Sequence, residues 1–169
     1  MVAAEAIPDA SHLWWAIRPS HKYPTLELRA PDSCARLEDA LGIAALYRAL
    51  VRHLYVDPAC NAEVDAVDRA IAVENKWRAQ RYGVEGSFAT RGGPLTVAEF
   101  LEKTIALVAE DADRLDCADE IGHCRLIVAE GSSADRQLAI YREVAETEGT
   151  EAAFAKVISW IADTTRQVA

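Results

Sequence analysis

The feature that most constrains this chain is a single change of pattern near Asp32. Before this residue, the segments SHLWWAIRPS and TLELR are typical of two short β-strands. After it, apolar residues recur every three or four positions, as they do in amphipathic helices. We therefore expect an α+β fold, with an antiparallel β-hairpin over about residues 11–31 packed on about five α-helices over about residues 33–168.

The expected hairpin has too few strands to be stable by itself. Isolated hairpins are marginal in water, and sheets normally contain more strands. We expect either that the hairpin packs wholly on the helices or that it is part of an incomplete sheet whose other strands come from elsewhere. With 169 residues, the chain is long enough for one hydrophobic core and short for two. The whole chain, residues 1–169, is therefore predicted to be a single domain.

Several helix boundaries can be predicted from local signals. The first helix is expected to start at Asp32 or Ser33, to end near Tyr55, and to be buried on most of its circumference. The second is expected over residues 61–82, because Gly83 is a typical C-terminal glycine. The sequence TVAE at residues 96–99 is a capping box that begins a helix with apolar positions as far as residue 115. Ser133, or alternatively Ser132, is expected to cap a later helix, and the last helix is expected over residues 151–168.

The charge of the chain limits its partners. Eighteen basic against twenty-seven acidic residues give a net charge of −9, which opposes binding to nucleic acid or anionic lipid. An anionic ligand would therefore have to be held by a local cluster of arginines. No apolar run approaches the roughly 20 residues of a membrane-spanning helix, and the first residues do not resemble a secretory signal. We expect a cytoplasmic protein that binds neither nucleic acid nor membrane.

The four cysteines lack the paired CxxC spacing of common metal sites. Their simplest interpretation is as reduced, partly buried small side chains. A zinc site formed by Cys117, His123 and Cys124 is the alternative. It would need a further ligand, and its spacing matches no standard zinc finger.

The two faces of the expected hairpin differ in chemistry. The simplest register places Arg18 opposite residue 25, residue 16 opposite Glu27, and Trp14 opposite Arg29. Side chains alternate across a strand, so one face is wholly apolar and is expected to meet the helices. The other face carries Trp14, Arg18, Glu27 and Arg29. A slip of two residues would preserve this division. The alternative interpretation of the polar face is a solvated surface with a cross-strand salt bridge.

The second expected helix carries a stripe that changes character along its length. Val64, Val67 and Ile71 are apolar and predict a core-facing side. The same stripe continues through Glu74, Asn75, Arg78 and Arg81. Polar residues on a core-facing stripe indicate a lined cavity, and arginines there suit phosphate. The alternative is a helix end that frays into solvent.

Three segments of the chain resemble a known family. They are the region from SHLWWAIRPS to LVRHLY, the helix motif ENKWRAQRYG, and the segment GSSADRQLAIYRE. Together they closely resemble the C-terminal half of bacterial carboxylate–amine ligases, also called weak or type 2 glutamate–cysteine ligases, in the glutamine-synthetase-like superfamily. The resemblance covers almost the whole chain, and the pattern RPS…PTLELR…D with ENKWRAQRYG downstream is specific.

The resemblance implies an ATP- and Mg²⁺-dependent joining of a carboxylate to an amine through an acyl phosphate. The typical substrates are L-glutamate and L-cysteine, or another amine in its place. Glu27 matches the family's expected metal ligand, and Arg29 matches the arginine expected to contact phosphate and take part in catalysis. Trp14 and Arg18 are implied contacts of substrate or nucleotide. The helix motif gives Asn75 a supporting role at the substrate, and Arg78 and Arg81 supporting roles at the phosphates.

The chain also departs from the family pattern. Ala16 stands where an acidic residue is usual, and Pro31 interrupts a position that is usually apolar or cysteine. The resemblance implies that the family's first half supplies the other strands and most acidic metal ligands, and the segments that match here belong to the second half only. Since Glu27 alone cannot build a Mg²⁺–ATP site, we expect this chain to be inactive by itself. A homo-oligomer or a separate N-terminal half is the expected partner. The alternatives are a non-catalytic helical module that binds a partner and a small-molecule binding domain that uses the arginine-lined face.

Overall fold

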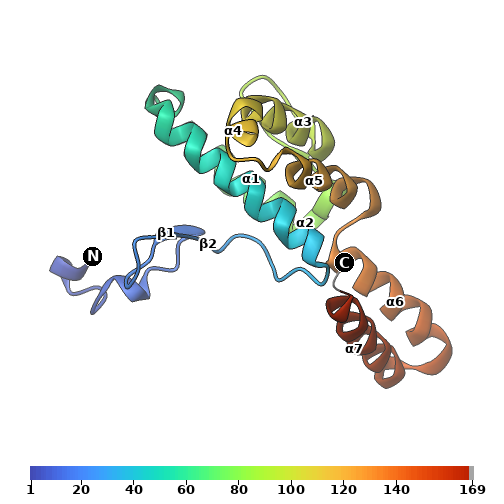
Figure 1. Cartoon of the computed structure of the whole chain (residues 1–169). Coiled ribbons are helices and arrows are strands. Elements are labelled where there is room, and N and C mark those ends of the chain that lie inside the picture. Colours follow the sequence, from blue (N-terminus) through green and yellow to red (C-terminus); the bar gives the residue numbers. More distant parts are fainter. Residues whose placement is uncertain (168–169) are drawn as a thin grey trace. The chain divides into compact units, whose positions relative to one another are not determined.

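The computed structural model of the chain describes residues 1–167, and its internal contacts divide it into two compact units (Figure 1). The first unit is Met1–Ser33, and the second begins at Cys34. This boundary lies where the sequence changes from strand-like to helical patterns. The assignment of both units to a single domain stays a prediction.

The first unit is built around the expected antiparallel hairpin. Strand β1 (Ile17–Pro19) pairs with β2 (Leu26–Leu28), and Arg18 lies opposite Glu27. This register differs by two residues from the expected one. The backbone N–H of Ser20 donates to the carbonyl of Thr25 at 2.8 Å, which closes a four-residue loop and sets the pairing. Because a shift of two residues keeps every side chain on its own face, the expected division into two faces is retained.

The apolar face of the hairpin is open within the first unit. Trp15 is 54% exposed, Ile17 51% and Leu26 50%. Besides the strands, this unit contains only the short 3₁₀ turns Val2–Ala4 and Ala10–His12. The packing of the apolar face on helices therefore stays a prediction.

The core of the second unit lies between long helix α1 (Leu37–Val56), α4 (Ala109–Arg114) and α5 (Ala118–Glu130), which run side by side in Figure 1. Its buried residues are mostly small. They are Ala45, Ala49, Val108, Ala112, Cys117 and Ile121. Small side chains let two helix backbones approach closely, and Gly42 lies at a close contact between α1 and α5. A Cβ atom at this position would lie 2.9 Å from the carbonyl oxygen of Glu120.

Two expectations about α1 are wrong. The helix begins at Leu37, not at Asp32 or Ser33, and its N-cap residue Arg36 makes no side-chain cap bond. The helix is also buried on one side only. Leu37, Leu41 and Leu54 are exposed, because α4 and α5 both pack on the side that carries Ala45 and Ala49.

Helix α2 (Ala66–Tyr82) starts later than expected but ends where predicted. Pro58–Asn61 forms a separate 3₁₀ turn, so the helix begins after Asp65, which forms a capping box with Asp68. Gly83 follows its last residue with φ of 55°, a conformation that favours glycine. The glycine-rich segment that follows forms a second small hairpin, β3 (Ser87–Phe88) with β4 (Leu95–Thr96).

The helix after β4 begins as predicted and then divides. The capping box of Thr96 and Glu99 is present at the start of α3 (Val97–Leu107). The expected single helix to residue 115 is interrupted at Val108, after which α4 begins. Val108 is fully buried, so the turn at this residue brings it and Ala112 into the core together.

The chain continues with a helical hairpin of α6 (Ser133–Glu148) and α7 (Thr150–Arg166). Ser132, the alternative candidate, caps α6, and Ser133 does not. The described part of the chain thus has seven α-helices where about five were expected, and the α+β class is confirmed. The predicted end of the last helix, at residue 168, lies outside the described residues. No helix among residues 1–167 is long and apolar enough to cross a membrane.

Candidate functional site

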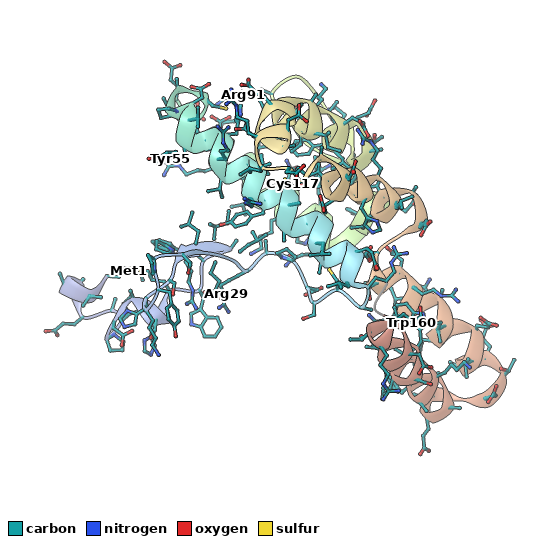
Figure 2. All side chains as sticks on the ribbon, viewed as in Figure 1. Met1, Arg29, Tyr55, Arg91, Cys117 and Trp160 are labelled. Carbon is teal, nitrogen blue, oxygen red and sulfur yellow. The ribbon has the colours of Figure 1, made fainter. Side chains whose placement is uncertain are left out.

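The polar face of the first hairpin brings four predicted site residues together. The Arg18 Nε donates to Glu27 Oε2 at 2.7 Å, and the Arg29 Nη1 donates to Glu27 Oε1 at 2.9 Å. The Arg29 guanidinium also lies 4.8 Å from the centre of the Trp14 ring, within the range of a cation–π contact. Figure 2 shows Arg29 on the hairpin. The sequence prediction that Trp14, Arg18, Glu27 and Arg29 share a face is therefore confirmed, and these four residues form what we call the hairpin cluster.

The two arginines of the hairpin cluster are held differently. Arg18 donates from Nη1 to the carbonyls of Leu13, at 2.7 Å, and Ser11, at 3.0 Å, in addition to its bond with Glu27. Its role is therefore to tie the N-terminal segment to the carboxylate. Arg29 uses only Nη1 in its ion pair, so most of its guanidinium donors remain available for a ligand.

The electrostatics of the hairpin cluster keep Glu27 ionised. The hydrogen bond from Arg18 lowers the pKa of the Glu27 carboxyl below its usual value, and the charge of Arg29 acts in the same direction against the effect of desolvation. The Glu27 side chain is 40% exposed. Since a carboxylate has about four lone-pair sites, it can accept both arginines and still offer an oxygen lone pair to a cation.

The predicted residues on α2 have a different environment. The Asn75 Oδ1 accepts from the N–H of Ala89 at 2.7 Å, and its Nδ2 donates to the carbonyl of the same residue at 2.9 Å. Arg78 pairs with Glu74 at 2.8 Å and reaches the carbonyl of Ser87 at 3.5 Å. Asn75 and Arg78 therefore brace the strand β3 against α2.

The stripe that predicted a lined cavity on α2 does not face a core. Val64 and Val67 are exposed, and α2 has no buried residue. Arg81 is exposed and lies over the ring of Tyr82 at 5.6 Å. For Arg81, the structure agrees with the alternative interpretation, in which the end of the helix lies in solvent. Since α2 and the hairpin cluster belong to different units, ligand contacts by Asn75, Arg78 and Arg81 stay predictions.

Metal ligands are sparse in the described part of the chain. Residues 1–167 contain no group of three His, Cys, Asp or Glu side chains placed to hold a metal ion. The zinc alternative is therefore wrong. Cys117 and Cys124 are buried, burial raises the pKa of both thiols, and His123 Nε2 lies 2.8 Å from Asp39. Glu27 is a suitable oxygen ligand for Mg²⁺, but one carboxylate does not fill its coordination shell.

Two buried carboxylates were missed by reasoning from the sequence. Asp39 pairs with His123 and with Arg36, whose Nε lies 3.1 Å away. Asp111 pairs with Arg52 and with His53 Nδ1, the latter at 2.9 Å. Burial raises the pKa of Asp111, but the hydrogen bonds from His53 and Arg52 outweigh it and hold the pKa below its usual value. Arg36 is only three residues from Asp39, but His123, Arg52 and His53 are more than 50 positions from the carboxylates that they contact, so no local motif predicts these pairs.

Comparison with known proteins identifies the family. The family model "Glutamate-cysteine ligase family 2 (GCS2)" matches residues 1–156. A "Putative glutamate--cysteine ligase 2" of Bradyrhizobium diazoefficiens is 56% identical over 94% of this chain and 36% of its own length. Proteins of the same name from Rhodospirillum rubrum and Paracoccus denitrificans are 43% and 37% identical, over 85% and 95% of this chain and over 37% and 44% of their own lengths.

The chain thus spans well under half the length of these curated relatives. The matched region includes both the hairpin cluster and the α2 motif. On these matches, the chain belongs to glutamate–cysteine ligase family 2.

Proposed function

We propose that this chain forms part of an ATP- and Mg²⁺-dependent carboxylate–amine ligase of the glutamate–cysteine ligase type. Its reaction would phosphorylate the carboxylate of L-glutamate and then let the amine of L-cysteine, or another amine, displace the phosphate. The observation that supports this proposal is the hairpin cluster. One ionised carboxylate and one arginine with free donors lie on the same strand face, inside the region that matches the family.

The residues of the hairpin cluster have separate roles in this proposal. When bound, Mg²⁺ would neutralise charge on the nucleotide phosphates. Glu27 would supply one of its oxygen ligands. Arg29 would donate from its free guanidinium N–H groups to the transferring phosphoryl group, as its planar fork suits phosphate oxygens. Arg18 would hold the Glu27 carboxylate in place, and Trp14 would support the Arg29 guanidinium from its ring face.

The hairpin cluster needs further groups to become an active site. Glu27 is its only carboxylate, and Mg²⁺ takes about six oxygen ligands. In addition, β1 and β2 form a two-stranded sheet, so each has an outer edge with unpaired backbone groups within that sheet. We propose that the part of the family absent from this chain supplies further ligands and pairs with this sheet, either in another copy of the chain or in a separate N-terminal half. Such an enzyme would work in the cytoplasm, where ATP is available.

A second candidate function is a non-catalytic helical module that binds a protein partner. The observation that favours it is the pair of exposed apolar side chains Leu37 and Leu41, which lie one turn apart on α1. Such a module would keep the sequence of glutamate–cysteine ligase family 2 but would not catalyse the ligase reaction.

The two candidates differ in what happens when the remaining part of the family is added. The isolated chain, incubated with ATP, Mg²⁺, L-glutamate and L-cysteine, is expected to release no phosphate above background. Addition of the remaining part of the Bradyrhizobium diazoefficiens relative, made separately, should produce glutamate-dependent phosphate release. Clear glutamate-dependent release by the pure chain would contradict the need for a second part. Stable binding of the added part with no release would favour the non-catalytic module.

A further inference from the structure

A cavity of about 330 Å³ lies in the second unit, where the start of α1, the α5–α6 junction and the last turns of α7 meet. In Figure 2, Trp160 lies on α7 near this junction. The volume is at the lower end of the range of small-molecule sites. All lining residues follow residue 34, so the cavity shares none with the hairpin cluster.

Two arginines line this cavity, and only one of them is neutralised. The Arg36 Nε bonds to Asp39 at 3.1 Å, and its Nη1 bonds to Glu130 at 3.1 Å. Arg136 differs, because no carboxylate or carbonyl within the described residues pairs with its guanidinium. Arg136 is exposed, and its guanidinium keeps its donors for a ligand at the edge of the cavity.

The other polar groups of the cavity are mainly unused donors. Across residues 1–167, the indole N–H of Trp160 and the hydroxyl of Thr164 have no hydrogen-bond partner. The Ser133 hydroxyl accepts from Gln137 at 3.2 Å and keeps its own hydrogen to donate. The carboxylates that line the cavity already bind Arg36. A ligand that satisfies this lining must therefore bring acceptors and negative charge.

We propose that this cavity binds a small organic oxyanion, a carboxylate or a phosphate, whose charge pairs with Arg136 and whose flat apolar part lies against Trp160. The N-terminus of α6 is not needed for this proposal, because Ser132 and Asp135 already cap it. The cavity provides both the donors and an aromatic wall, which together set the orientation of such a ligand.

The test uses three small probes of similar shape. Benzoate and phenyl phosphate carry the two oxyanions, and benzamide is a neutral analogue of benzoate. Each is titrated at constant ionic strength while the indole N–H resonance of Trp160 is followed by NMR, with Trp160→Phe used to assign that resonance. We expect a saturable shift with benzoate, phenyl phosphate or both, and none with benzamide. The oxyanion that binds with the higher affinity identifies the ligand class, carboxylate or phosphate.

Matched variants test the role of Arg136. Arg136→Gln is expected to weaken binding at least tenfold, since it removes a charge-assisted hydrogen bond. Arg142→Gln makes the same change on an exposed part of α6 away from the cavity, and binding should stay within twofold. Circular dichroism checks that both variants keep their helix content, and Arg136→Lys, which keeps the charge, should lose less affinity than Arg136→Gln.

Three results would overturn the proposal. They are the absence of a saturable shift with either oxyanion, equal binding of benzamide, and equal loss of affinity in Arg136→Gln and Arg142→Gln. Because the probes need neither ATP nor the hairpin cluster, the outcome is independent of the proposed ligase activity.

Discussion

Substitution of Gly42 by alanine tests the close packing of α1 on α5, on which the core of the second unit depends. A Cβ atom at Gly42 would lie 2.9 Å from the backbone carbonyl of Glu120 and 3.4 Å from the Cys124 sulfur. A backbone oxygen cannot rotate away as a long side chain can, so the two helices would have to separate. Their separation would loosen the contacts of Ala45, Ala49 and Ile121 in the core.

The magnitude follows from two opposing effects. Alanine is favoured over glycine inside a helix by about 1 kcal/mol, whereas overpacking of a tight core costs about 1–3 kcal/mol. Because the obstacle is backbone, we expect the upper part of that range and a net loss of about 1–2 kcal/mol. Gly122 is the matched control, since it lies inside α5 and its Cβ would meet only the Arg125 guanidinium at 3.8 Å. Gly122→Ala should gain about 0.5–1 kcal/mol.

Thermal unfolding followed by circular dichroism separates these outcomes. For a chain of this size, 1 kcal/mol corresponds to about 2–4 °C in Tm. Gly42→Ala should therefore lower Tm by about 2–8 °C, and Gly122→Ala should raise it by about 1–4 °C. A Tm for Gly42→Ala at or above that of the unmodified chain, with Gly122→Ala behaving as expected, would refute the close approach of α1 and α5.

Three further predictions concern other parts of the molecule. The hydrogen bond from Arg91 lowers the pKa of Asp68 from 3.8 to about 2, so the stabilisation that this ion pair gives the fold is complete above about pH 4 and is lost toward pH 2. Arg91→Gln should therefore make the free energy of unfolding less dependent on pH over this range. Asn75→Ala removes two bonds to Ala89, so hydrogen exchange of the Ala89 amide should accelerate, whereas Gln80→Ala should leave it unchanged. Light scattering over a concentration series should give masses above the 18.5 kDa monomer if hairpin edges pair; a constant monomer mass would contradict self-association.

The features that could be predicted from the sequence are those decided locally. The capping box of Thr96 and Glu99 depends on two residues three positions apart, and it is present in the structure. The polar face of the hairpin was predictable for a similar reason. Alternation assigns each side chain to a face, and this assignment survived a register shift of two residues.

The features that could not be predicted depend on residues far apart in sequence. Helical spacing identifies the apolar side chains of α1, but it does not say which side meets α4 and α5. The helix was therefore expected to be buried on most of its circumference, whereas Leu41 is exposed. Asp39 and His123 are 84 positions apart, and nothing near either residue indicates their pairing. Arg136 belongs to the family-like segment GSSADRQLAIYRE, yet only the fold shows that it faces a cavity.

The most direct test of the proposed ligase site is the glutamate-dependent rate of phosphate release by this chain joined to the remaining part of the Bradyrhizobium diazoefficiens relative. The comparison is between the unmodified Glu27 and Glu27→Gln, with Glu85→Gln as a control at an exposed carboxylate outside the hairpin cluster. We expect Glu27→Gln to lower the rate by several orders of magnitude while Tm stays unchanged, and Glu85→Gln to retain the full rate. A Glu27→Gln protein that keeps the full rate, or that loses Tm in step with activity, would contradict the assignment of the hairpin cluster as part of the ligase site.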